Sequence, residues 1–236
     1  MTKTLDIKLG IYLILSFIIF TIIGTVSHEL GHYTVAKILG HEASINYAHT
    51  RHVDVNSRTQ IDQIYAKYSN EIPKGDYPEK QQYEIIVSKM IHDSFIVTIG
   101  GPLQTMLTGT IGLIILFIQR KKFFTSVKLD MNQWVIIFVT LFWLRQSFNF
   151  AHGIVKYILV GKFPYSNDEA RLANHLHINE LSITTSTALI GAVILYIIVF
   201  KYIPISQRLT FIVSGLIGGL LGFYIWLILL GPIVMP

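Results

Sequence analysis

The chain contains no cysteine, and charged residues are scarce: Asp, Glu, Lys and Arg together make up 14% of its 236 residues. The absence of cysteine excludes disulfide bonds and any metal site with thiolate ligands. Soluble domains carry roughly 25% charged residues. Because 52% of this chain is hydrophobic, its composition excludes an ordinary soluble domain and is typical of a membrane protein.

A strong excess of charge of one sign is also lacking, since the net charge is only +5. The basic residues are scattered among the segments between apolar runs, whereas nucleic-acid-binding proteins gather them in blocks or patches. We therefore expect no nucleic-acid partner. A modest positive charge suits a protein that faces anionic lipid headgroups, so the lipid bilayer is an expected partner.

Long apolar runs make up much of the chain. A helix needs about 20 apolar residues to cross the hydrocarbon core of a bilayer. Five runs approach or exceed this length, namely residues 9–26, 94–118, 134–160, 184–203 and 209–234. The sequence predicts an all-α polytopic membrane protein with about five transmembrane helices, which forms a single membrane domain over residues 1–236. We expect an integral, multi-pass protein of a bacterial cell membrane.

One sizeable insertion, residues 41–93, separates the first two runs. Its first part alternates apolar and polar residues, which is typical of strands and predicts a small β-hairpin over residues 43–56. An amphipathic helix follows over residues 58–69. Its apolar face suits the membrane interface and consists of Ile61, Ile64, Tyr65 and Tyr68.

The sequence His-Glu-Leu-Gly-His at residues 28–32 directly follows the first apolar run. On a helix, positions i and i+4 share a face, so His28 and His32 can direct both imidazoles to one Zn²⁺. Glu29 would then lie close enough to act as a general base on water. Gly31 would leave room for a substrate backbone. A chance match is the alternative, but three ionisable groups beside a membrane span are rare and usually functional.

Two further stretches complete a resemblance to a known family. Residues 100–105 resemble a Gly-Pro-x-x-Asn motif, with Thr105 in place of the asparagine. Residues 163–172 resemble a Pro-x-x-x-Asp-Gly-x-Arg-Leu motif, with Glu169 in place of the glycine. Together with the histidine motif, they make the chain similar to the site-2 proteases, which are intramembrane zinc metalloproteases. The similar core covers residues 9–178 with the insertion, and the helices within 184–234 are additional.

The resemblance implies one Zn²⁺ per chain, held by His28, His32 and Asp168, with Glu29 as the catalytic base. It also implies that the second motif borders the substrate cavity with Gly101, Pro102 and Thr105. Counting spans supports one shared site, because the three motifs all fall on the same side of the membrane. Asn167 can cap the helix that begins at Asp168, which would free Asp168 for the metal.

The third apolar run carries one polar face, formed by Arg145, Asn149 and His152. These residues would either line the catalytic cavity, where Arg145 or His152 stabilises an oxyanion, or form hydrogen bonds that hold the helices together. The sequence leaves both interpretations open. His152 is also the rival of Asp168 for the third ligand position. The histidines of loops and helix ends, such as His41, are expected on the solvated surface.

The expected function is that of an intramembrane zinc endopeptidase, which hydrolyses membrane-spanning or membrane-anchored proteins or peptides. The alternative is a catalytically inactive scaffold or regulator, which the departures at Thr105 and Glu169 keep open. A metal transporter would need polar ligands midway along several spans, and residues 184–234 have almost none. The resemblance also implies that the hairpin holds an unwound substrate segment by strand addition, and an ordinary surface hairpin without a role in binding is the alternative. The oligomeric state does not follow from the sequence.

Overall fold

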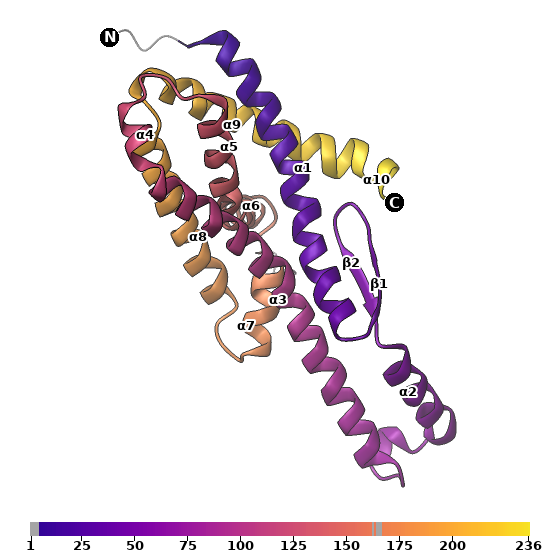
Figure 1. The fold of residues 1–236 in the computed structure, drawn as a ribbon. Helices are drawn as coiled ribbons and strands as arrows, with labels where there is room; N and C mark the ends of the chain where they lie inside the picture. The colour runs from indigo at the N-terminus through magenta and orange to yellow at the C-terminus, as the bar shows by residue number, and fades with distance from the viewer. Residues whose placement is uncertain (1–4, 162, 164–166) are drawn as a thin grey trace.

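The structure is a computed structural model that describes residues 5–161, 163 and 167–236. Within these residues, five helical segments are long and apolar enough to cross a membrane: Ile7–Ile38, Lys80–Ile118, Met131–Val160, Leu181–Tyr202 and Ile205–Val234. A two-stranded hairpin lies beside the first of them (Figure 1). The predicted set of five long apolar helices with a small hairpin is thus confirmed. Residues 164–166, part of the third family motif, lie outside the described residues.

The helix α1 (Ile7–Ile38) carries the histidine motif in its later turns. It begins where the carboxylate of Asp6 accepts a hydrogen bond of 3.1 Å from the backbone N of Leu9. It ends just before Gly40, whose φ of +80° is a conformation that glycine adopts without strain. The helix therefore continues beyond the first apolar run, and the motif has regular helical geometry.

The hairpin pairs β1 (Glu42–Ile45) with β2 (Thr50–Val53) in antiparallel fashion, with Ile45 opposite Thr50. It is shorter than predicted, because Asp54 caps the helix α2 (Val55–Tyr68). The Asp54 carboxylate accepts a hydrogen bond of 3.1 Å from the backbone N of Ser57. Residues 55 and 56, predicted within the hairpin, are therefore helical.

The helix α2 packs against the start of α3 (Lys80–Ile118) after the short 3₁₀ turn η1 (Ile72–Lys74). Its Ile64 is buried against Tyr77 and Ile86. Tyr65 remains exposed. The apolar face that the sequence suggested for the membrane interface is thus partly covered by protein.

The third long segment is interrupted, although a continuous helix was predicted over residues 134–160. It consists of α5 (Met131–Thr140), the 3₁₀ turn η2 (Leu141–Trp143) and α6 (Leu144–Val160). The helix α3 approaches this break very closely. A Cβ atom on Gly112 would lie 2.5 Å from the backbone N of Thr140, and one on Gly109 would lie 2.5 Å from the Trp143 ring. The break places α6 beside the histidine motif.

The remaining elements are α4 (Arg120–Thr125), α7 (Asp168–His175), α8 (Leu181–Ile197), η3 (Ile198–Tyr202), α9 (Ile205–Tyr224), η4 (Ile225–Leu230) and α10 (Gly231–Val234). The helix α9 lies along α1 (Figure 1). Two glycines permit this approach, because a Cβ on Gly218 would lie 2.7 Å from the carbonyl O of Ile14, and one on Gly222 would lie 2.9 Å from Cβ of Thr21. The core beside them contains Phe17, Phe138 and Phe211, with Phe17 in ring contact with both others.

The C-terminal segment holds the tip of the hairpin. The indole Nε1 of Trp226 donates a hydrogen bond of 2.9 Å to the carbonyl O of Tyr47. The backbone N of Tyr47 donates one of the same length to the carbonyl O of Met235. The last span and the hairpin are therefore joined on the side of the bundle that carries the histidine motif.

Candidate metal centre

Three side chains of the histidine motif meet inside the bundle. His28, Glu29 and His32 are 1%, 5% and 8% exposed. One ligand atom of each lies within 4.8 Å of the others. Burial of three ionisable groups is costly unless they are paired or bind a metal. The three buried groups therefore need a partner that offsets the cost of their burial.

Asp168 provides that partner from α7. Its Oδ2 lies 2.9 Å from Nε2 of His28 and 3.2 Å from Nε2 of His32. Asn167 caps the helix, as predicted, by accepting a hydrogen bond of 3.2 Å from the backbone N of Ala170. Burial alone would raise the pKa of Asp168, but its close contacts with the two imidazoles, favourable when a ring is protonated, hold this pKa well below its usual range. The group is thus a carboxylate.

The outer contacts of the two histidines determine which ring nitrogen carries a hydrogen. Nδ1 of His32 lies 2.8 Å from the carbonyl O of Val97, which can only accept, so this nitrogen donates. The longer contact of 3.3 Å from the backbone N of Gly101 to the same Nδ1 is secondary. Nδ1 of His28 lies 2.9 Å from Oγ1 of Thr105, whose own hydrogen goes to the carbonyl O of Gly101 at 3.0 Å. Nδ1 of His28 therefore donates as well.

Both Nε2 atoms are consequently lone-pair nitrogens when the imidazoles are neutral, and both face the Asp168 carboxylate. Three acceptor atoms then converge with no hydrogen between them. Such a set needs a cation or an added proton at its centre. Histidines that bind a metal through one nitrogen while donating from the other to a carbonyl or hydroxyl are the usual pattern in metal sites. The donor set therefore fits a divalent metal.

Glycines of α1 and α3 bring the two helices together at this point. A Cβ on Gly101 would lie 2.3 Å from Nε2 of His32 and 2.6 Å from Nε2 of His28. A Cβ on Gly31 would lie 2.4 Å from the carbonyl O of Gly100. The expectation that Gly31 leaves room for substrate was therefore wrong, because α3 takes that space. Pro102 follows within α3 and is buried.

The hairpin reaches the site through Thr50, which sequence reasoning missed. Its Oγ1 lies 2.9 Å from the carbonyl O and 3.1 Å from Oε2 of Glu29. No motif in the sequence marks Thr50. The expectation that the hairpin lies beside the metal was the one signal that could have indicated a residue of β2 at this place. The contact places β2 next to the proposed base.

A cavity of about 420 Å³ opens beside the four residues, and Arg145, Asn149 and His152 of α6 line it. Arg145 interacts electrostatically with the carboxylates of Asp168 and Glu29. His152 has a different environment: its ring lies 6.4 Å from that of Phe148, and it makes no hydrogen bond to the converging groups within the described residues. The cavity-lining interpretation of this polar face thus agrees with the structure.

Glu169 is a buried carboxyl that the family comparison treated only as a replaced glycine. It is 2% exposed, and Asn149 of α6 is its side-chain hydrogen-bonding neighbour. Burial raises the pKa of Glu169, and the nearby Asp168 raises it further, while Arg145 opposes both effects. The departure from glycine therefore places a third acid, after Glu29 and Asp168, next to the site.

A second polar cluster anchors the hairpin and includes His41. The expectation that His41 lies on the solvated surface was wrong, because the residue is 5% exposed. Nε2 of His41 lies 3.2 Å from Asp93 on α3, and Nδ1 lies 3.2 Å from Nδ1 of His52 on β2. Lys89 pairs with both Asp93 and Asp54. Burial lowers the pKa of His52, and the neighbouring His41 lowers it further. The Lys89 ammonium supplies the positive charge that a metal would bring to this cluster.

Comparison of the chain with family models, with curated proteins and with solved structures finds no match. What the chain does is therefore inferred from its own residues.

Proposed function

We propose that this chain is a multi-pass intramembrane zinc endopeptidase, similar to the site-2 proteases, which cuts membrane-spanning or membrane-anchored peptides. The observation that carries the proposal is the convergence of Nε2 of His28, Nε2 of His32 and Oδ2 of Asp168, with both Nδ1 atoms turned outward as donors. Five helices of sufficient length and apolarity support a location in the membrane.

His28, His32 and Asp168 would hold the metal, which leaves an open coordination position as in other hydrolytic zinc sites. When bound, Zn²⁺ supplies Lewis acidity. Glu29 would take one proton from the attacking water and deliver it to the leaving amine as the C–N bond breaks. The hydroxyl part of the water remains on the acyl carbon, which becomes a carboxylic acid. Arg145 would stabilise the negative charge that develops on the carbonyl oxygen.

The same ligand set, two histidines and one carboxylate, also binds ferrous iron in oxygenases. Glu29 favours hydrolysis over that chemistry. A buried acid beside the three ligands is not needed to hold the metal, but a metalloprotease needs one as its base.

The hairpin would present the substrate to this site. A peptide bond in a helix is protected by its backbone hydrogen bonds, so a membrane helix must unwind before it is cut. A two-stranded sheet has unpaired edges that can bind an extended segment by strand addition. The contact of Thr50 with Glu29 favours β2 as the strand nearest the cut.

Metal removal tests the function directly. We expect about one zinc and no iron per chain in the purified protein. Hydrolysis of single-span peptides in vesicles should stop after chelation and return when zinc is added, because the three ligands otherwise hold nothing that polarises the peptide bond. Elemental analysis and peptide mass spectrometry provide the two readouts. Bound iron, or cleavage that survives metal removal, would contradict the proposal. Bound zinc without any cleavage would favour the inactive scaffold.

Thr105 offers a second test, because it stands where the family carries asparagine. Thr105→Val keeps the shape but removes the hydroxyl that accepts from His28, so zinc affinity should fall about 10- to 100-fold. Thr105→Ser keeps the hydroxyl and should bind zinc nearly as well as the wild type. Competition with a chromophoric chelator measures both. Equal affinity of the Val and Ser variants would show that Thr105 does not orient His28.

A further inference from the structure

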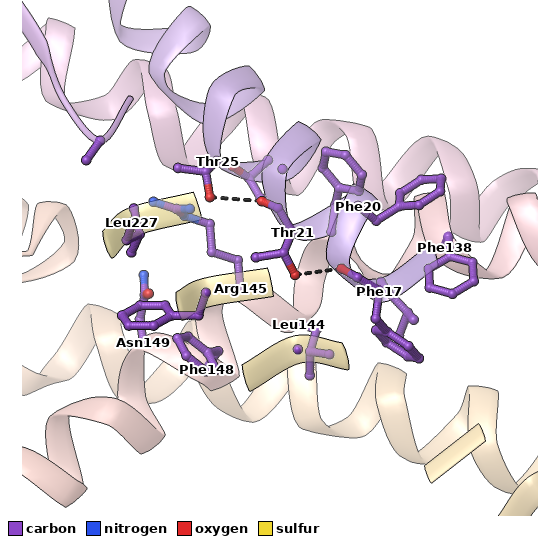
Figure 2. A pocket seen from close by; sticks show the side chains of 17 residues that line it. Phe17, Phe20, Thr21, Thr25, Phe138, Leu144, Arg145, Phe148, Asn149 and Leu227 are labelled. Carbon is purple, nitrogen blue, oxygen red and sulfur yellow. Dashed lines mark hydrogen bonds between the residues drawn. The ribbon is translucent and has the colours of Figure 1, made fainter. Parts of the chain in front are cut away.

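A second cavity, of about 270 Å³, lies inside the bundle between the first, third and fifth long helical segments. Its walls come from α1, from the interrupted segment around η2, and from α9 with η4. Figure 2 shows Phe17, Phe20 and Phe138 together at one end, and Arg145 and Asn149 at the other. The cavity thus has an aromatic end and a polar end.

The polar end is continuous with the candidate metal centre. Ala48, Arg145 and Asn149 line both cavities. Thr105, which contacts His28, also lines the second one. A peptide bond placed at the metal would therefore have the mouth of this second cavity directly beside it.

The wall offers little to a polar ligand away from that mouth. The hydroxyl of Thr21 donates to the carbonyl O of Phe17 at 2.7 Å, and that of Thr25 donates to the carbonyl O of Thr21 at 2.9 Å (Figure 2). These hydrogens are therefore already used. A group that accepts hydrogen bonds, such as a carbonyl or carboxylate, would lose its water in the aromatic end without gaining a donor, which is unfavourable.

The size of the cavity also limits its occupant. Sites for drug-sized ligands measure roughly 300–1,000 Å³. A cavity of about 270 Å³ lies just below this range, which suits one or two large side chains better than a whole lipid. Among apolar occupants, a substrate side chain is favoured over a free apolar molecule. The cavity opens beside the proposed peptidase centre, and a bound substrate brings its own side chains to that place.

We propose that this cavity is the specificity subsite of the enzyme, and that it selects substrates with a bulky apolar side chain, aromatic or leucine-like, next to the bond that is cut. The inference rests on the proposed function. It also gives the last span a role, because Gly219, Phe223 and Leu227 form one wall. The close packing at Gly218 and Gly222 holds that wall against α1.

Two glycines allow the subsite to be filled without disturbing the fold. Gly24 and Gly219 both line the cavity, and a Cβ atom on either would meet nothing within 4 Å. In Gly24→Leu and Gly219→Leu, kcat/KM for substrates with Phe or Leu beside the cut should fall at least about 10-fold, because a few methylene groups in an apolar pocket carry that discrimination. Substrates with Ala at the same position should be cut as by the wild type.

Matched controls lie on the same helices. Ile23→Phe and Leu216→Phe enlarge exposed side chains that do not line the cavity, and they should leave the substrate preference unchanged. A wild type that cuts the Ala and Phe substrates equally well would overturn the subsite. So would filled variants that lose both substrates equally.

A binding measurement separates failure of the subsite from failure of the proteolytic function. Because the chain has no cysteine, Gly24→Cys provides a single thiol in the cavity wall, placed in an otherwise Glu29→Gln background. A single-span peptide with Phe at the selected position should slow thiol alkylation in vesicles at least about 10-fold, and the Ala peptide should not. Protection without hydrolysis by the wild type would retain the subsite and refute the protease. Equal alkylation with both peptides, or a thiol already blocked in lipid alone, would refute the subsite.

Discussion

Glu29→Gln is expected to lower peptide hydrolysis by about 10²- to 10⁴-fold, the usual contribution of a general base, while about one zinc per chain remains bound. Glutamine has the size of glutamate but cannot accept the proton of the attacking water. The contact with Thr50 survives the change, because the amide oxygen can still accept the hydroxyl hydrogen. Peptide cleavage and zinc content should be measured on the same preparation.

The double readout matters because Glu29 lies within ligand distance of both histidines. If Glu29 were a metal ligand rather than the base, the variant would lose zinc together with activity. Glu42→Gln is the matched control, since Glu42 lies exposed on β1, outside the cavity. It should retain both zinc and cleavage. Full activity in Glu29→Gln would refute the mechanism.

The parts of the site that sequence could predict are those set by local geometry. His28, Glu29 and His32 belong to one helix, and the i, i+4 spacing alone brings the two imidazoles to one face. The cap at Asn167 is likewise local, so the freedom of Asp168 could be predicted from adjacent residues. The long apolar helices follow from composition and length, which require no knowledge of packing.

The parts that sequence could not predict depend on how helices cross. Gly31 was assigned to substrate, but its lack of a side chain serves the approach of α3. Thr50 and Glu29 are separated by 21 positions, and their contact depends on how the hairpin folds back onto α1. The break at η2 contains no proline or glycine from which it could have been predicted. Its neighbours Gly109 and Gly112 lie on another helix, so no pattern within the third run could reveal it.

The burial of His41 illustrates the same limit. Its loop position suggested solvent, whereas the structure places it between α3 and β2, in contact with Asp93 and His52. Only α3 and β2, together with the loop that carries His41, create that environment. The hairpin is thereby held at both ends, by this cluster near its base and by Trp226 at its tip. A rigid hairpin is what strand addition beside the site requires.

Asp168→Ala is expected to reduce zinc affinity by about 100-fold or more, whereas His152→Ala should leave it near the wild-type value. Removal of a direct ligand should cost more than the roughly 10- to 100-fold loss that follows when a hydrogen bond orienting a ligand is removed. Asp168 makes contacts of 2.9 and 3.2 Å with the two Nε2 atoms. His152 instead lies beside Phe148 and Phe223, 6.4 and 6.2 Å between ring centroids.

Asp168→Asn separates loss of charge from loss of position. It keeps the side-chain shape at the start of α7, where Asn167 still caps the helix, so the fold should be retained while zinc binding weakens. Asn is neutral, and a neutral oxygen is a poorer ligand for a divalent cation than a carboxylate. Zinc affinity should therefore rank wild type, then Asp168→Asn, then Asp168→Ala, with His152→Ala beside the wild type. Loss of zinc in His152→Ala alone would move the metal into the α6 side of the cavity and remove the basis for the resemblance to site-2 proteases.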